Sequence, residues 1–486
     1  MSAGLKRTLF QTLIYAFSIV FTKGVSVILT PLYSSTLKSA EEYGVYAYFL
    51  VAIAFLSILM SFGLETTYFR FENQKKYSHV ANKLFSIHVL IALLACLIFI
   101  PFPERWSILV INETGYQSHF LVAVAILIAD LLCVIPFAQI RQNNQALRYA
   151  TINIIYVAVT LTLNLLALVY IPKWIENGSI TAPWFDKDEL IFYVLLATLA
   201  GSLVKLLLLS PEFLKLKLDF KHQLYKPILR YAIPITIAGF AYVINEMIDR
   251  EFIKRFLDNH LEVNGIYSMN YKVVALLMML MTAFRWGVEP FLFKLQGQSK
   301  DKTTYAFLLK LFTILMCLGA LFIVFNKELI QTIYITNPAY HQGFEVVPPL
   351  LLAVLFLGIY TNLSIWYKLI DKTYFGMNFS IIGAIITLSI NALFIKEYGY
   401  MACAWATCCC YFVMMLLSFV FGQKHYPIPY NIKRILTYIG LAFGLFALSQ
   451  KLDTYPLYYH NMSLIFFIFV AYFLEKKDIK TLFNHD

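Results

Sequence analysis

Apolar stretches of about twenty residues recur from one end of this chain to the other. A helix of about twenty apolar residues is long enough to cross a hydrocarbon core of about 30 Å. The stretches lack the alternation of polar and apolar residues that a membrane β-barrel needs. A spanning helix satisfies its own backbone hydrogen bonds, which lipid cannot do. The sequence therefore predicts an all-α polytopic membrane protein.

The composition supports this prediction, because 60% of the residues are hydrophobic and only 14% are charged, against about 25% charged in soluble domains. The first stretch contains Lys23 and no clear cleavage site follows it, so we interpret it as a span and not as a signal peptide. We predict fourteen transmembrane helices, near residues 10–30, 44–64, 84–101, 119–138, 150–171, 189–209, 231–250, 265–287, 306–325, 347–367, 374–395, 400–422, 433–450 and 458–474.

The distribution of basic residues predicts the orientation of these helices. Most of the 39 Lys and Arg residues lie at the termini and in the segments that follow even-numbered spans. By the positive-inside rule, both termini are expected in the cytoplasm. The net charge of +11 is therefore a topology signal, and no basic surface with interleaved aromatic residues indicates a nucleic-acid partner. The densest basic segment, 215–230, is predicted to be a cytoplasmic linker near anionic membrane lipids.

Three pairs of similar segments indicate an internal duplication. EEYGVYAYF (41–49) resembles EVNGIYSMN (262–270), Gly63-Leu64-Glu65 resembles Gly287-Val288-Glu289, and LTLNLLAL (161–168) resembles LSINALFI (388–395). The offsets of 221, 224 and 227 residues predict two parallel six-helix repeats, related by an axis along the membrane normal. The expected organisation is an N-terminal half (1–210), a linker (211–230), a C-terminal half (231–422), and two additional helices with a cytoplasmic tail (423–486).

Charged residues within or beside the spans are the candidate functional residues, since a charge in a bilayer normally faces a partner or a wet cavity. Glu65 and Glu289 end matching spans, and either form a cytoplasmic gate with cations such as Arg70 and Arg285, or are solvated helix ends. Lys205 lies near a helix end and is expected to reach the interface. The cations Lys23, Lys272 and Arg285 are candidates for binding an anionic head group such as a diphosphate. The other candidates, for a gate or for ion coupling, are Asp130, Glu246, Asp249 and Arg250.

Several classes of function lack the motifs they require. Seven cysteines include no CxxC pair, and no His-rich spacing indicates a metal, so we expect neither a metal nor a cofactor. The sequence also contains no Walker motif and no Ser-His-Asp arrangement. The largest predicted external segments, 102–118 and 172–188, are short for a glycan polymerase or ligase. We therefore expect a transporter and not an enzyme.

The N-terminal segments LTPLYSSTLKSAEEYGVYAYF and GLETTYFRF, with the duplicated core plus two spans, resemble the Wzx-type oligosaccharide flippases. These belong to the superfamily that also contains lipid II flippases and multidrug exporters. The resemblance implies movement of an undecaprenyl-diphosphate-linked oligosaccharide from the inner to the outer leaflet of the bacterial plasma membrane, by alternating access, for polysaccharide such as the O-antigen of lipopolysaccharide.

The expected partners are the lipid-linked oligosaccharide, membrane lipids, a proton or sodium ion, and glycan polymerase machinery. In the resembled family the central cavity is cationic, and Lys23, Lys272 and Arg285 would supply that charge here. Some relatives have Arg in the first span where this chain has Lys23, which replaces a bidentate donor by a point charge. A lipid II flippase and a small-molecule exporter of the same superfamily stay open as alternatives.

Overall fold

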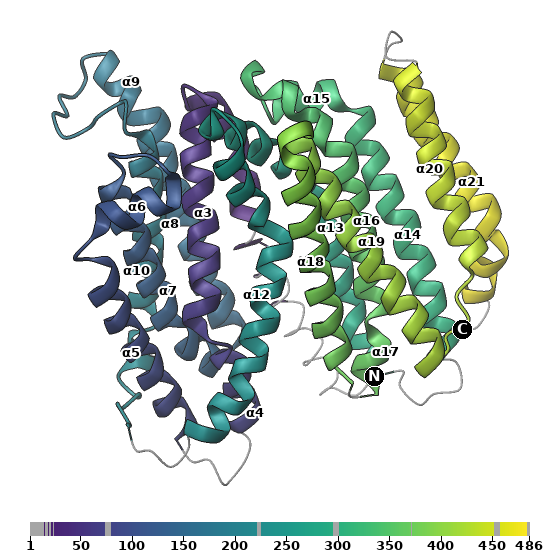
Figure 1. The fold of residues 1–486 in the computed structure, drawn as a ribbon, viewed down its shortest axis with the longest axis horizontal. Coiled ribbons are helices and arrows are strands. Elements are labelled where there is room, and N and C mark those ends of the chain that lie inside the picture. The colour runs from purple at the N-terminus through teal and green to yellow at the C-terminus, as the bar shows by residue number, and fades with distance from the viewer. Residues whose placement is uncertain are drawn as a thin grey trace. The chain divides into compact units, whose positions relative to one another are not determined.

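The computed structural model describes residues 14, 18, 21–22, 24–72, 79–220, 225–294, 301–370, 372–451 and 457–483. Every element in this part of the chain is helical (Figure 1). The elements are α2 (Thr30–Thr36), α3 (Ala40–Ser61), α4 (Leu64–Glu72), α5 (Val80–Phe99), α6 (Pro103–Ile111), α7 (Gln117–Gln142), α8 (Ala146–Leu165), the π-helix η1 (Leu166–Tyr170), α9 (Ile171–Glu176), α10 (Leu190–Leu208), α11 (Ser210–Phe213), α12 (Tyr225–Phe256), α13 (His260–Lys294), α14 (Asp301–Phe325), α15 (Lys327–Ile333), the 3₁₀ helix η3 (Pro338–Val346), α16 (Val347–Leu363), α17 (Ile365–Leu369), α18 (Tyr374–Tyr398), α19 (Tyr400–His425), α20 (Ile432–Lys451) and α21 (Leu457–Phe483).

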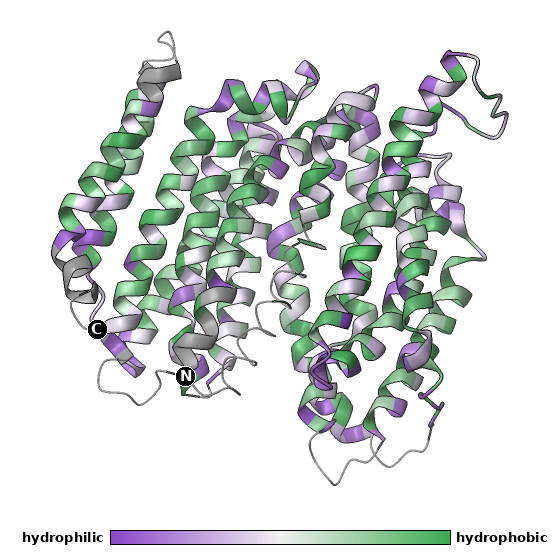
Figure 2. Ribbon diagram, turned by 180° about the vertical axis from the view of Figure 1, so that it is seen from behind, coloured by the Kyte–Doolittle hydropathy of each residue, from purple (hydrophilic) through white to green (hydrophobic). Residues whose placement is uncertain are grey.

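The described residues contain twelve helices that are long and apolar enough to cross a membrane. These twelve correspond in order to the second to thirteenth predicted spans, from Ala40–Glu72 to Ile432–Gln450. About half of the first predicted span lies outside the described residues, and the fourteenth falls within the helix α21. Figure 2 shows that the long helices are mainly apolar along their middle sections and more polar near their ends. The prediction of an all-α polytopic membrane protein is confirmed.

The chain divides into two compact units, residues 1–268 and 269–486. The boundary falls inside α13, whose first turns belong to the first unit and whose remainder belongs to the second. The halves and the linker 211–230 rest on the sequence repeat, and those boundaries stay predictions.

In the first unit, α7 is the central helix, because it packs against α3, α5, α6, α8 and α10. Its buried face includes Phe120, Leu127, Leu131 and Ile135, and these side chains meet apolar residues of the surrounding helices. Helix α12 packs along α3 and α4 on another side of the unit. A helix that is apolar around most of its circumference is expected in this central position.

A reciprocal contact between two glycines joins α3 to the first turns of α13. A Cβ atom placed on Gly44 would lie 1.8 Å from the carbonyl oxygen of Leu261, and one placed on Gly265 would lie 1.8 Å from that of Ala40. The Asn264 Nδ2 donates to the Gly44 carbonyl oxygen at 2.9 Å. Gly44 and Gly265 are equivalent positions of the duplicated segments 41–49 and 262–270. The two copies of the duplicated segment, 41–49 and 262–270, therefore contact each other through equivalent glycines.

In the second unit, α16 packs between α14 and α19, and α18 covers another side of α19. The two additional helices, α20 and α21, lie side by side and pack on α14 (Figure 1). A buried ion pair fixes them there: Lys310 of α14 pairs with Glu475 of α21, and Tyr438 of α20 donates to the Glu475 Oε1 at 2.5 Å. One carboxylate thus connects three helices.

We expect Gly44→Leu to destabilise the fold, because its side chain cannot fit against the backbone of α13. The matched control is Gly440→Leu in α20, since a Cβ there meets nothing within 4 Å. Thermal unfolding of both variants in detergent should show a clear drop in Tm for Gly44→Leu alone. Equal Tm values for the two variants would contradict the close helix contact.

We expect Lys310→Met to destabilise the protein by about 3–5 kcal/mol, because it leaves the buried Glu475 carboxylate without its cation. The double variant Lys310→Met/Glu475→Gln should recover much of this loss, since it removes both charges. Denaturation of the wild type, of Lys310→Met, of Glu475→Gln and of the double variant in detergent gives the coupling between the two sites. Additive losses would show that the two side chains do not depend on each other.

Candidate functional site

A cluster of buried polar residues lies near the end of α12. Asn245, Glu246, Asp249 and Arg250 are each at most 8% exposed. A charged residue placed within a membrane helix costs about 2.5–3.5 kcal/mol on insertion scales, so each of these charges needs a partner. Glu246, Asp249 and Arg250 are among the gate or ion-coupling candidates that the sequence predicts on this ground.

The first turns of α13 supply a partner that the sequence analysis missed. The Tyr267 hydroxyl donates to the Asp249 Oδ2 at 2.7 Å, and the guanidinium of Arg250 lies 5.0 Å from the centre of the Tyr267 ring. The Arg250 Nη1 also donates to the Glu246 carbonyl oxygen at 3.0 Å. One tyrosine therefore contacts an acid and a base of α12 at once. Its place in the duplicated segment 262–270, beside Gly265, is a signal that could have drawn attention to it.

Glu65 lies in the first turn of α4, just after the end of α3, and forms an ion pair with Arg141 of α7 at 2.5 Å. The expectation that Arg70 would be its partner is wrong. The two residues are five apart in α4, so their side chains point about 140° apart around the helix axis. The Arg70 guanidinium instead lies 4.5 Å from the centre of the Tyr231 ring of α12. The gate assigned to Glu65 and Arg70 stays a prediction.

Asp130 and Lys205 form an ion pair between α7 and α10. Ser202 donates to the Asp130 Oδ1 at 3.0 Å, and the Lys205 ammonium lies 4.7 Å from the centre of the Tyr156 ring. The expectation that Lys205 reaches the interface is therefore wrong, because the lysine is held by a carboxylate, and only 14% of its side chain is exposed. Asp130 had been selected from the sequence, but not as the partner of Lys205.

Of the three cations predicted to line a cavity, Lys272 and Arg285 are among the described residues and Lys23 is not. Lys272 is half-buried in α13, and its carbonyl oxygen accepts from the Tyr334 hydroxyl at 3.5 Å. Arg285, on the same helix, is exposed. Lys23 and the side chain of Glu289 lie outside the described residues. The cationic cavity therefore stays a prediction.

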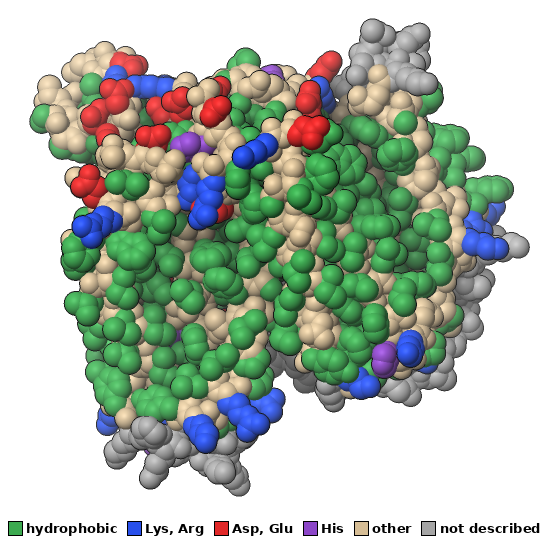
Figure 3. Space-filling view, in the orientation of Figure 1, with side chains coloured by type: hydrophobic (Ala, Val, Ile, Leu, Met, Phe, Trp, Pro, Cys, Tyr) green, Lys and Arg blue, Asp and Glu red, His purple; other side chains and the backbone are tan. Residues whose placement is uncertain are grey.

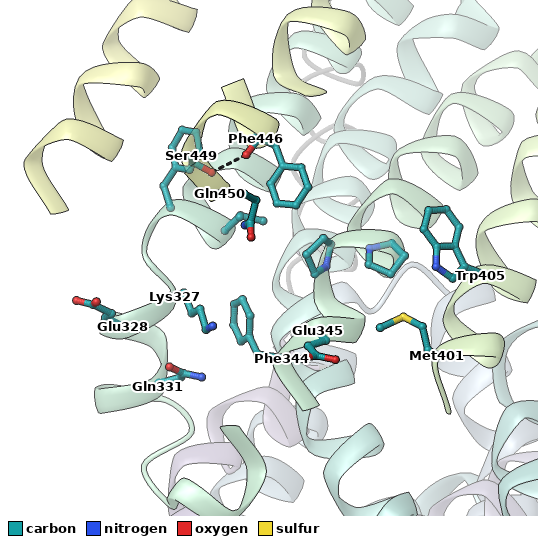
Figure 4. A pocket seen from close by; sticks show the side chains of 14 residues that line it. Lys327, Glu328, Gln331, Phe344, Glu345, Met401, Trp405, Phe446, Ser449 and Gln450 are labelled. Carbon is teal, nitrogen blue, oxygen red and sulfur yellow. Dashed lines mark hydrogen bonds between the residues drawn. The ribbon is translucent and has the colours of Figure 1, made fainter. Parts of the chain in front are cut away.

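The second unit contains a cavity of about 650 Å³ that the sequence analysis did not foresee. It lies among α14, α15, η3, α16, α19 and α20 (Figure 4). Trp405 and Met401 lie on one side of it, Lys327 and Gln331 on the other, and Gln450 at its rim (Figure 4). The Lys327 ammonium lies 5.5 Å from the centre of the Phe344 ring. None of the site residues selected from the sequence lines this cavity.

Within the described part of the chain, no three His, Cys, Asp or Glu side chains gather as a metal-binding group. The seven cysteines are free thiols, and five of them are buried.

Three solved structures share the fold of this chain. The lipid II flippase MurJ in an inward closed conformation matches with a TM-score of 0.76 and 15% identity, over 97% of this chain and all of that one. A multidrug resistance MATE family transporter matches in its inward-facing conformation with a TM-score of 0.63 and 10% identity, over 86% of this chain and 97% of the other. An outward-facing MATE structure matches with a TM-score of 0.57 and 12% identity, over 85% and 95%. At these identities the likeness shows the fold alone.

No curated protein matches the sequence significantly. A family model does match it, over residues 9–296, which is more than half of the chain, and that family is described as polysaccharide biosynthesis protein. This is the family of the Wzx-type flippases that the sequence resembles. The chain is thus a multi-pass membrane protein that belongs to the polysaccharide biosynthesis protein family.

Proposed function

We propose that this protein is a flippase that moves an undecaprenyl-diphosphate-linked oligosaccharide from the inner to the outer leaflet of the bacterial plasma membrane. The observation that carries the proposal is the family match over residues 9–296. The fold shared with MurJ, a lipid II flippase, is compatible with a substrate that has a lipid tail. Both termini would be cytoplasmic, as the distribution of Lys and Arg predicts.

The proposed mechanism is alternating access. The MATE structures that share this fold include inward-facing and outward-facing conformations, so the fold itself accommodates both. In this chain, α3 and α13 begin equivalent halves of the duplication, and they meet at Gly44 and Gly265. This contact would close the outer end of the substrate path, and it would have to open for release.

The proposed roles of the charged residues follow from the chemistry of the substrate. Lys23, Lys272 and Arg285 would bind the diphosphate, because charge-assisted hydrogen bonds are the strong ones available to a phosphate. The acids would supply the gate or carry a coupling proton or sodium ion, and the candidates are Glu65, Asp130, Glu246, Asp249 and Glu289. A glycan polymerase would use the flipped lipid-linked oligosaccharide.

A second candidate function is the flipping of lipid II, favoured by the match to MurJ over the full length of both chains. Lipid II and the lipid-linked oligosaccharide share the diphosphate and the isoprenoid tail, so the same cations would serve both. The two substrates are distinguished by expressing the protein in two strains, one that lacks its oligosaccharide flippase and one that lacks its lipid II flippase.

We expect the protein to restore surface glycan in a strain that lacks its own oligosaccharide flippase. Lys23→Ala and Lys272→Ala should each reduce the restored glycan about tenfold or more, since a hydrogen bond to a charged group contributes about 1.5–3 kcal/mol. The matched control is Lys187→Ala, whose exposed ammonium pairs with Glu176. Glycan on the cell surface is measured at equal membrane abundance of all four proteins.

A parallel strain that lacks its lipid II flippase tests the second candidate. Rescue of growth there, without rescue of surface glycan, would reassign the substrate to lipid II. Rescue of glycan by both lysine variants at the level of the control would remove those lysines from the substrate path.

We expect a cross-link between Tyr48→Cys and His260→Cys to stop transport, because the rings of Tyr48 and His260 lie 5.9 Å apart beside the glycine contact. The seven native cysteines are first replaced by serine or alanine. The control pair is Arg148→Cys with Glu212→Cys, two residues that form an ion pair at 2.6 Å and precede the second half. A reducible thiol cross-linker should inhibit the first pair reversibly and leave the control active. Full activity of the cross-linked Tyr48–His260 pair would contradict alternating access by separation of α3 from α13.

A further inference from the structure

A groove of about 420 Å³ in the first unit lies among α3, α5, α6, α7 and α12. Its walls are mainly aliphatic and aromatic, and its apolar residues include Ala52, Phe55, Phe99, Met247 and Ile248. The groove continues along the last turns of α12 up to Arg255, one residue before the helix ends. It therefore joins an apolar slot within the membrane span to the end of a spanning helix, where lipid head groups lie.

The charged residues that line the groove are mostly basic. Arg250, Lys254 and Arg255 contribute three positive charges, and Glu251 contributes one negative charge. Two other acids of α12, Glu246 and Asp249, do not line the groove. Asp249 instead accepts from Tyr267 of α13. At 100° per residue, positions 247, 251 and 254 share one face of the helix, and 246, 249 and 253 share another. Two of the three acids of α12 thus lie off the groove, and the groove is lined by more cations than acids.

The cations are held in place at the helix end. The Lys254 Nζ donates to the carbonyl oxygens of Leu109 at 2.8 Å and Val110 at 3.2 Å, in the last turn of α6. The Glu251 carboxylate accepts from both Lys254 and Arg255 at 2.6 Å. Arg255 keeps 65% of its side chain exposed, so donors that Glu251 does not use face outward. Figure 3 shows acidic and basic side chains mixed near this end of the first unit, with a largely apolar surface next to them toward the middle of the helices.

We propose that this groove binds an anionic phospholipid, with an acyl chain against the apolar walls and the phosphate at Arg255 and Lys254. Charge complementarity carries the choice of lipid: each Lys or Arg near the surface attracts an anionic lipid by about 1 kcal/mol, and a zwitterionic lipid has no net charge to match. The length and apolar walls of the groove exclude a fully hydrated phosphate as its only occupant. The proposal concerns a bound lipid of the membrane and stands apart from the transported substrate.

The test is lipid binding to the purified full-length protein, measured by native mass spectrometry after delipidation and addition of phosphatidylglycerol or phosphatidylethanolamine. The wild type should retain phosphatidylglycerol in preference. Arg255→Gln should weaken phosphatidylglycerol binding about fivefold, the factor that about 1 kcal/mol gives, without changing phosphatidylethanolamine binding. Ala52→Phe should weaken both lipids, because the larger side chain fills the apolar part of the groove.

The matched control is Lys187→Gln, which removes an exposed cation outside the groove. Arg255 is preferred to Lys254 as the test position, because Lys254 also holds the end of α6. Tm values measured without lipid establish that the variants are folded. Equal retention of both lipids by the wild type, or equal losses for Arg255→Gln and Lys187→Gln, would overturn the proposal. Displacement of phosphatidylglycerol by an equimolar polyprenyl phosphate would overturn it too, and would assign the groove to the carrier lipid.

Discussion

The contact between Gly44 of α3 and Gly265 of α13 is the constraint on which the rest of the first unit depends. Two helix backbones reach this separation only where neither carries a Cβ atom. The contact therefore fixes the register of α3 against α13, and with it the positions of Asn264 and Tyr267. Because the two glycines are equivalent in the duplicated sequence, the arrangement is self-complementary, as in an interface between two identical partners.

The second constraint on the fold is the burial of charged side chains. It explains why these side chains lie next to partners on other helices. Lipid offers no hydrogen bonds, so a charge within the helical region is satisfied by protein, by a wet cavity, or by reaching the interface. The pairs Asp130–Lys205 and Lys310–Glu475 are examples of the first solution, and each links different helices. Tyr267 gives a second form of the same solution, since its hydroxyl donates to Asp249 and its ring face contacts Arg250.

The spans, the duplication and the family could be predicted from the sequence, because they depend on the length and order of apolar segments. The partners of the charges could not. Arg141 lies 76 residues from Glu65, and only the packing of α4 on α7 brings them together. The sequence shows that Lys205 is near a helix end, which led to the expectation that it reaches the interface. The sequence does not show that folding brings Asp130 of another helix to it. Lys310 was overlooked although it stands within a predicted apolar span, a signal that should have placed it among the buried charges.

The contact of α14 with α21 and the contact of α3 with α13 contain different kinds of polar link. Lys310 of α14 and Glu475 of α21 form a buried ion pair, and removing one member costs about 3–5 kcal/mol because the other charge stays buried without a partner. At the glycine contact the polar links are neutral hydrogen bonds, from Asn264 to the Gly44 carbonyl oxygen and from Tyr48 to the His260 carbonyl oxygen. Each contributes only about 0.5–1.5 kcal/mol, and water can replace it when the helices part. The proposed alternating-access mechanism needs one junction that opens reversibly between elements that stay intact, and we propose that α3 and α13 form this junction.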